Sequence, residues 1–132
     1  MCGIAGVIVA NSELPNRSTE DMALALRRLQ HRGPDDQGTA PISFDRGTES
    51  LRGHLGHRRL SIVDVAGGHQ PLVHADGSIL IFNGEIYNFE ALKKSFRDVR
   101  WKTRSDTEVL LHVLKRNSVK GLAALNGMFA FA

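Results

Sequence analysis

MCGIAGVIV, residues 1–9, places the only cysteine of this 132-residue chain directly behind the initiator methionine. Removal of Met1 would give Cys2 both a thiol nucleophile and a free α-amine. Because an α-amine titrates close to neutral pH, it can accept the proton of the thiol on the same residue and act as its base. Cys2 can also be interpreted as a small apolar residue that opens a strand. The motifs in the rest of the sequence decide between the two interpretations.

The segments after Cys2 predict an α+β domain rather than a regular βαβ alternation. Residues 3–9 are apolar throughout and predict a buried strand, and Ser18 begins an amphipathic helix that ends near Gln30. Residues 31–38 (HRGPDDQG) lack periodicity and predict a loop. Alternating apolar residues then predict a strand that starts near Leu51 and continues through HRRLSIVD to Asp64.

The second half of the chain predicts more helix than strand. Residues 79–82 form a short buried strand that stops at Asn83-Gly84, a pair typical of tight turns. Asn88 is expected to cap one helix, and Ser105 with Glu108 forms a capping-box pattern for another helix. The last residues, GMFAFA, read as the opening of a strand.

Composition excludes several classes of function. Lysine and arginine exceed aspartate and glutamate by only 17 − 14 = +3 charges, and the basic residues are dispersed, so a nucleic-acid partner is not expected. The sequence predicts neither a membrane span nor a signal peptide, since a buried first strand explains the apolar start better, and a single cysteine fits the reducing cytoplasm. The histidine pair His54 and His57 would face opposite sides of a strand, and with His69 and His74 it does not predict a metal site.

Four loop-like segments carry polar residues that no strand or helix requires, namely HRGPD at 31–35, RRLSIVD at 58–64, NGEIYN at 83–88 and SDTE at 105–108. Together with the MCGIAG start, they resemble class II glutamine amidotransferase domains, and among these the glutaminase half of asparagine synthetases. The resemblance covers the whole chain. It implies an Ntn-hydrolase fold, a four-layer α/β/β/α sandwich of two sheets between helix layers. Domains of this family continue beyond the position of Ala132, so a C-terminally incomplete domain is expected.

The resemblance implies a reaction in which glutamine and water give glutamate and ammonia. Cys2 would attack the side-chain carboxamide while its α-amine moves the proton. Asn83, through its side-chain NH₂, and Gly84, through its backbone N–H, match the family's oxyanion hole, and such donors typically lower the barrier by about 3–4 kcal/mol each. A simple hairpin turn is the alternative interpretation of the Asn-Gly pair.

The same resemblance implies residues that bind the two charged ends of glutamine. A guanidinium can hold a carboxylate through two parallel hydrogen bonds. Arg58 and Arg59 face opposite ways on a strand, and the motif selects Arg59, which leaves Arg58 as a surface charge. The full set of expected glutamine-binding residues is Arg59, Leu60, Ser61, Ile62, Val63, Asn83, Gly84, Glu85 and Asp106, with Asp106 and Glu85 on the ammonium.

The partners expected from the resemblance are L-glutamine and a synthetase domain or subunit that receives the ammonia. Residues 1–132 would be one truncated glutaminase domain with no cofactor of its own, because ATP and Mg²⁺ belong to the synthetase domain, which amidates aspartate. Two alternatives stay open at this point. The chain could be an inactive or non-catalytic module for binding or assembly, or the glutaminase half of an amidotransferase that acts on another acceptor.

Overall fold

The computed structural model describes residues 2–10, 18–62, 64 and 67–132. In chain order the elements are β1 (Gly3–Ala10), α1 (Ser18–Arg28), β2 (Asp36–Arg46), β3 (Glu49–Arg59), β4 (Leu72–Val73), β5 (Ile79–Leu80), β6 (Phe82–Ile86), α2 (Phe89–Ser95), α3 (Asp106–Asn117), the 3₁₀ helix η1 (Ser118–Ala124) and β7 (Gly127–Phe131). The mixture of helices with antiparallel strand pairs agrees with the α+β prediction.

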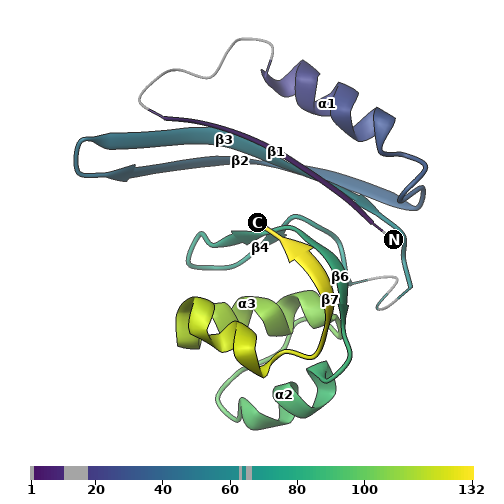
Figure 1. The fold of residues 1–132 in the computed structure, drawn as a ribbon, viewed down its shortest axis with the longest axis vertical. Helices are drawn as coiled ribbons and strands as arrows, with labels where there is room; N and C mark the ends of the chain where they lie inside the picture. Colours follow the sequence, from purple (N-terminus) through teal and green to yellow (C-terminus); the bar gives the residue numbers. More distant parts are fainter. Residues whose placement is uncertain (1, 11–17, 63, 65–66) are drawn as a thin grey trace.

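The first sheet has the order β1–β3–β2, and α1 lies along one of its faces (Figure 1). The helix packs through Met22 and Leu26, which are 4% and 3% exposed. Gly56 on β3 lets the helix approach, because a Cβ at this position would lie 2.6 Å from the Met22 sulfur. The predicted helix that begins at Ser18 is therefore confirmed, and its apolar stripe covers the sheet.

The opposite side of this sheet faces the β6–β7 pair, with α3 and α2 beyond it (Figure 1). Alternate side chains of β6 and one stripe of α3 form the main core there. The buried members of that core are Leu80, Phe82, Ile86, Leu110 and Leu111. A second cluster of Phe96, Val109 and Val113 continues it beneath α2.

His57 connects the two parts of the fold. It lies on β3, is fully buried, and its Nε2–H donates to the carbonyl of Phe82 on β6 at 3.0 Å. Burial lowers the pKa of His57 to about 4, because a charged imidazole would lose its hydration there. A neutral imidazole thus fixes the position of β6 relative to the first sheet at neutral pH.

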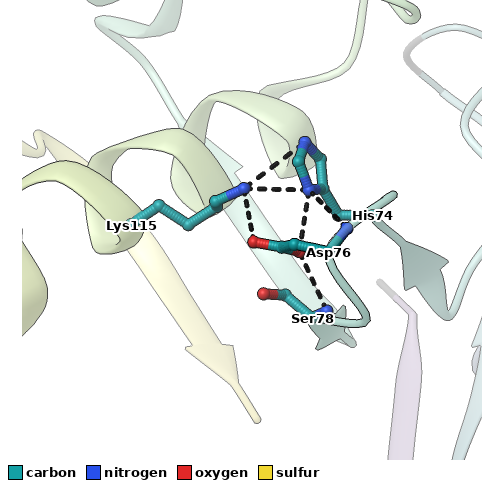
Figure 2. A network of polar contacts seen from close by, with 4 residues as sticks. All are labelled: His74, Asp76, Ser78 and Lys115. Atoms are coloured by element: carbon teal, nitrogen blue, oxygen red, sulfur yellow. Dashed lines mark hydrogen bonds and ion pairs between the residues drawn. The ribbon is translucent and has the colours of Figure 1, made fainter.

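A polar network fastens the β4–β5 hairpin to the last turns of α3. Figure 2 shows Lys115 of α3 reaching the Asp76 carboxylate, at 2.7 Å, and the His74 ring in the hairpin. The Ser78 N–H also donates to Asp76. Lys115 and these donors hold the pKa of the Asp76 carboxyl far below its usual range. The network therefore attaches the hairpin to α3 and stabilises the end of α3 that lies away from Cys2.

Several local predictions are wrong, and each has a physical reason. The first strand is not buried, since Ile8 is 54% exposed on β1, an edge strand of its sheet. The loop predicted at 31–38 ends early, because residues from Asp36 onward pair with β3. The strand predicted through Asp64 ends at Arg59.

Among the described residues, no helix is long and apolar enough to cross a membrane.

The predicted caps are also replaced by longer-range contacts. Asn88 precedes α2, but its side chain bonds the backbone of Ala124 and Asn126 instead of capping its own helix. Ser105 makes no side-chain cap to α3. The Glu108 carboxylate accepts hydrogen bonds from the Lys102 and Thr103 amides, which fixes the loop that leads into α3.

Candidate functional site

A cavity of about 200 Å³ opens where Cys2, the end of β3, the edge of β6 and the start of α3 meet. It gathers the predicted site residues Cys2, Arg59, Leu60, Ile62, Asn83, Gly84, Glu85 and Asp106. Ser61 is not part of its lining, and Val63 lies outside the described residues. Residues from four separate stretches of the sequence therefore reach one cavity.

Cys2 lies immediately before β1 and is half-buried. The Leu60 N–H points at its sulfur, with 3.4 Å between N and Sγ. Arg32 donates from Nε to the Cys2 carbonyl at 3.1 Å and holds the backbone of the residue. Cys2 is thus held through its sulfur by Leu60 and through its carbonyl by Arg32, at the wall of the cavity.

The HRGPD segment positions the strand end on which Leu60 lies. The Asp35 N–H donates to the Arg59 carbonyl at 3.0 Å, and the Asp35 carboxylate accepts the Ser61 N–H at 2.7 Å. Gly33 permits this approach, since a Cβ there would lie 2.5 Å from the Arg58 backbone. Ser61 consequently has a structural contact and does not face the cavity.

The Asn83-Gly84 pair does not form the hairpin turn of the alternative interpretation, and the strand predicted to stop at this pair continues through it as β6. Its register with β7 pairs Gly84 with Phe129. Ile81 and Ala132 exchange two hydrogen bonds, at 2.8 and 3.0 Å, and the Tyr87 N–H donates to Asn126 at 2.7 Å. Because antiparallel pairs alternate between bonded and non-bonded, the Gly84 N–H points away from β7.

Three N–H groups thus line the outer edge of β6, and two of them have side-chain acceptors. The Phe82 N–H donates to Gln70 Oε1 at 2.6 Å, and the Ile86 N–H donates to Asp106 Oδ2 at 3.1 Å. No acceptor for the Gly84 N–H occurs in the part of the chain that the structure describes. The central amide of the row is therefore open to the cavity.

Asn83 lines the same cavity and brings a side-chain carboxamide to its wall. Its Oδ1 is buried and has no partner among the described residues. Position 84 requires glycine for a reason unrelated to the cavity, because a Cβ there would lie 2.5 Å from the Cα of Phe129.

Arg59 ends β3 and is only 6% exposed. Its Nη2 donates to the Asp64 carbonyl at 2.6 Å, and Gly68 lies against the guanidinium without a side chain in the way. Asp64 is itself held, because its carboxylate accepts the Arg104 N–H at 2.8 Å. The prediction that Arg58 is a surface charge is wrong, since Arg58 is 7% exposed and bonds the Gln37 carboxamide on β2.

Asp106 begins α3 and brings a buried carboxylate to the cavity opposite Arg59. Burial raises the pKa of Asp106, while hydrogen bonds from the Ile86 amide and from its own helix turn lower it. The neighbouring Glu85 carboxylate adds to the rise and is itself exposed. The cavity thus has a cationic guanidinium from β3 and two carboxylates near β6 and α3.

Sequence reasoning missed several residues of the lining. These are Gly68, Gln70, Phe82, Ser105, Thr107 and Met128. Gln70 had a recognisable signal, because a polar side chain immediately before Pro71 had no role in any predicted element. Among the described residues, no group of three or more histidine, cysteine, aspartate or glutamate side chains could hold a metal ion.

The chain was compared with known proteins. A family model described as a glutamine amidotransferase domain matches residues 1–132. Asparagine synthetase [glutamine-hydrolyzing] 1 of Arabidopsis thaliana is 36% identical over 132 residues, and asparagine synthetase [glutamine-hydrolyzing] 2 of Oryza sativa subsp. japonica is 40% identical over 133. The corresponding protein of Asparagus officinalis is 37% identical. Each alignment covers 99% of this chain and 21% of the relative, so the chain spans about a fifth of their length.

Proposed function

We propose that this chain, which belongs to the glutamine amidotransferase domain family, hydrolyses glutamine to glutamate and ammonia with Cys2 as its N-terminal nucleophile. The observation that carries the proposal is the meeting of Cys2, Arg59, the Asn83-Gly84 pair and Asp106 around one cavity. These residues come from four distant segments, and none of the local elements requires them to converge. An acyl-transfer site needs such a set, with a nucleophile, oxyanion donors and groups that bind the substrate's ends.

The reaction begins at the Cys2 sulfur. After removal of Met1, the α-amine takes the thiol proton, and the thiolate adds to the side-chain carbonyl carbon of glutamine. The new C–S bond pushes the π electrons onto oxygen. When the carbonyl re-forms, the C–N bond breaks, and the α-ammonium returns its proton to the leaving nitrogen as ammonia. Water, deprotonated by the same amine, then displaces sulfur from the thioester and yields glutamate.

The oxyanion of each tetrahedral intermediate lies against β6. Two groups support this assignment, namely the open N–H of Gly84 and the carboxamide of Asn83, which also lines the cavity. Both are fixed before substrate arrives, because β6 is paired with β7 and held by Gln70 and Asp106. Preorganised donors of this kind lower the barrier without a reorganisation cost.

Arg59 and the two carboxylates of Asp106 and Glu85 bind opposite charged ends of glutamine. The guanidinium binds the α-carboxylate, and the carboxylates of Asp106 and Glu85 bind the α-ammonium. Leu60 and Ile62 line the cavity beside Cys2 and Arg59 and supply its apolar wall. This arrangement places the carboxamide of the substrate at the Cys2 and Gly84 side of the cavity.

The wider proposals follow from family membership. The first sheet and the β6–β7 pair, with α1 on one side and α3 and α2 on the other, support a four-layer α/β/β/α sandwich of the Ntn-hydrolase type. Residues 1–132 act as a cytoplasmic glutaminase domain without a cofactor of its own. The relatives are asparagine synthetases, which supports aspartate as the final ammonia acceptor, in an ATP- and Mg²⁺-dependent synthetase domain or subunit.

Glutamate release tests the proposal directly. We expect the protein without Met1 to release glutamate and ammonia in equal amounts from L-glutamine, and Cys2→Ala to release neither. Intact mass establishes the state of the N-terminus, and circular dichroism establishes that both proteins are folded. Equal glutamate release by the two proteins would refute the assignment of Cys2 as nucleophile.

A further inference from the structure

We propose that Gln70 is a positioning residue that aims the Gly84 N–H into the cavity, an inference that rests on the proposed glutaminase function. Gln70 lies in the segment between β3 and β4, outside every motif that identified the site. It is 5% exposed and lines the cavity, yet both ends of its carboxamide are occupied by the protein itself. A carboxamide whose nitrogen and oxygen both bond the protein suits the support of a neighbour better than contact with substrate.

The carboxamide of Gln70 connects α3 to β6. Its Nε2 donates to Thr107 Oγ1 at 3.3 Å, and its Oε1 accepts the Phe82 N–H at 2.6 Å. The backbone of Gln70 is fixed as well, because it packs so closely on Gly38 of β2 that a side chain there would collide with its carbonyl. Gln70 is thus a rigid support with three separate attachments.

The support acts on the peptide group two residues before Gly84. The Phe82 N–H is held by Gln70, and the Phe82 carbonyl is held by His57 from the first sheet. Farther along the edge, Asp106 holds the Ile86 N–H. Gly84 lies midway between these fixed points, so the direction of its N–H depends on both. Loss of Gln70 would leave the Phe82 N–H without its acceptor and loosen one flank of the row.

Gln70→Met tests the inference, because methionine has a similar length and offers neither bond. Misplacement of a catalytic group by about 1 Å can cost about 100-fold in rate. We therefore expect kcat for glutamate release to fall about 10- to 100-fold, with KM for glutamine within about threefold of wild type. KM is retained because Arg59 and Asp106 bind the ends of glutamine from other elements.

Thr107 provides a second test that leaves the buried volume unchanged. Thr107→Val removes the hydroxyl that receives Gln70 Nε2, and we expect a smaller fall in kcat, which Thr107→Ser recovers. Gln30→Met, at an exposed position in the turn after α1, is the matched control. Leu26→Ala controls for destabilisation alone, because it opens a cavity beneath α1, far from β6, and should lower the melting temperature without lowering kcat at 25 °C.

Amide hydrogen exchange supplies a readout that does not depend on turnover. The Phe82 amide should lose at least tenfold of its protection in Gln70→Met, while the Ile86 amide keeps its protection. Unchanged kcat in a folded Gln70→Met, or unchanged Phe82 protection, would overturn the role of Gln70. A folded wild-type protein without glutaminase activity would instead refute the proposed function, and the positioning role in catalysis with it.

Discussion

Gly68→Ala should weaken glutamine binding through Arg59 without a change in the chemistry at Cys2. A Cβ built on Gly68 would lie 2.2 Å from Arg59 Nη2, and the same nitrogen donates to Asp64 at 2.6 Å. Because atoms of this kind approach no closer than about 3.5 Å, the guanidinium must retreat by about 1 Å. The clashing group is the end of a flexible side chain, so the fold should tolerate the change.

The retreat removes the charge-assisted hydrogen bonds between Arg59 and the α-carboxylate of glutamine. Bonds of this kind contribute about 1.5–3 kcal/mol, which corresponds to about a 10- to 150-fold rise in KM. The value of kcat should change little, because the carboxylate is bound equally in the ground and transition states.

Steady-state ammonia release from two substrates isolates the effect. The decarboxylated analogue 4-aminobutanamide keeps the carboxamide and the ammonium but lacks the carboxylate, so its kcat/KM should be the same in wild type and Gly68→Ala. Gly6→Ala on β1, whose nearest neighbour is a Leu55 methyl at 3.2 Å, is the control. Equal losses for glutamine and 4-aminobutanamide would refute the assignment of Arg59 to the carboxylate.

Three further predictions concern binding and stability. Asp106→Asn should raise KM for glutamine by about tenfold, since it removes a charge that pairs with the α-ammonium, and an unchanged KM in steady-state assays would contradict this role. Burial lowers the pKa of His57 from 6.5 to about 4, so the unfolded chain binds a proton that the folded chain excludes between these values. The free energy of unfolding should therefore fall by about 3 kcal/mol as pH drops through this window. Urea titrations should show that His57→Gln, which can still donate to Phe82, loses this slope. Leu110→Ala should cost about 2–5 kcal/mol in the same titrations, because Leu110 is fully buried between α3 and β6.

The sequence was sufficient where local pattern and tertiary context agree. The helix from Ser18, the helix that follows Ser105 and the strand at GMFAFA all occur where the sequence predicts them. The convergence of Cys2, Arg59 and Asp106 came from the motifs taken together. Local spacing alone could not place residues about fifty positions apart around one cavity.

The sequence predictions are wrong where pairing with a distant strand determines the local structure. Asn83-Gly84 has the composition of a turn, but pairing with β7 extends it, and the close approach of Phe129 explains the glycine. Arg58 is buried because β2 supplies Gln37 as its partner, and β2 was not predicted. That strand contains Pro41, which is tolerated because β2 is an edge of its sheet.

The most direct test of the central claim is covalent labelling of Cys2 by 6-diazo-5-oxo-L-norleucine, a diazoketone analogue of glutamine. The thiolate of the only cysteine displaces nitrogen from the reagent, and intact mass with N-terminal peptide mapping locates the adduct. We predict one adduct per chain, on Cys2 of protein without Met1, formed more slowly when L-glutamine is in excess. No adduct on the folded protein without Met1, or labelling that glutamine does not slow, would contradict an N-terminal thiol within a glutamine site.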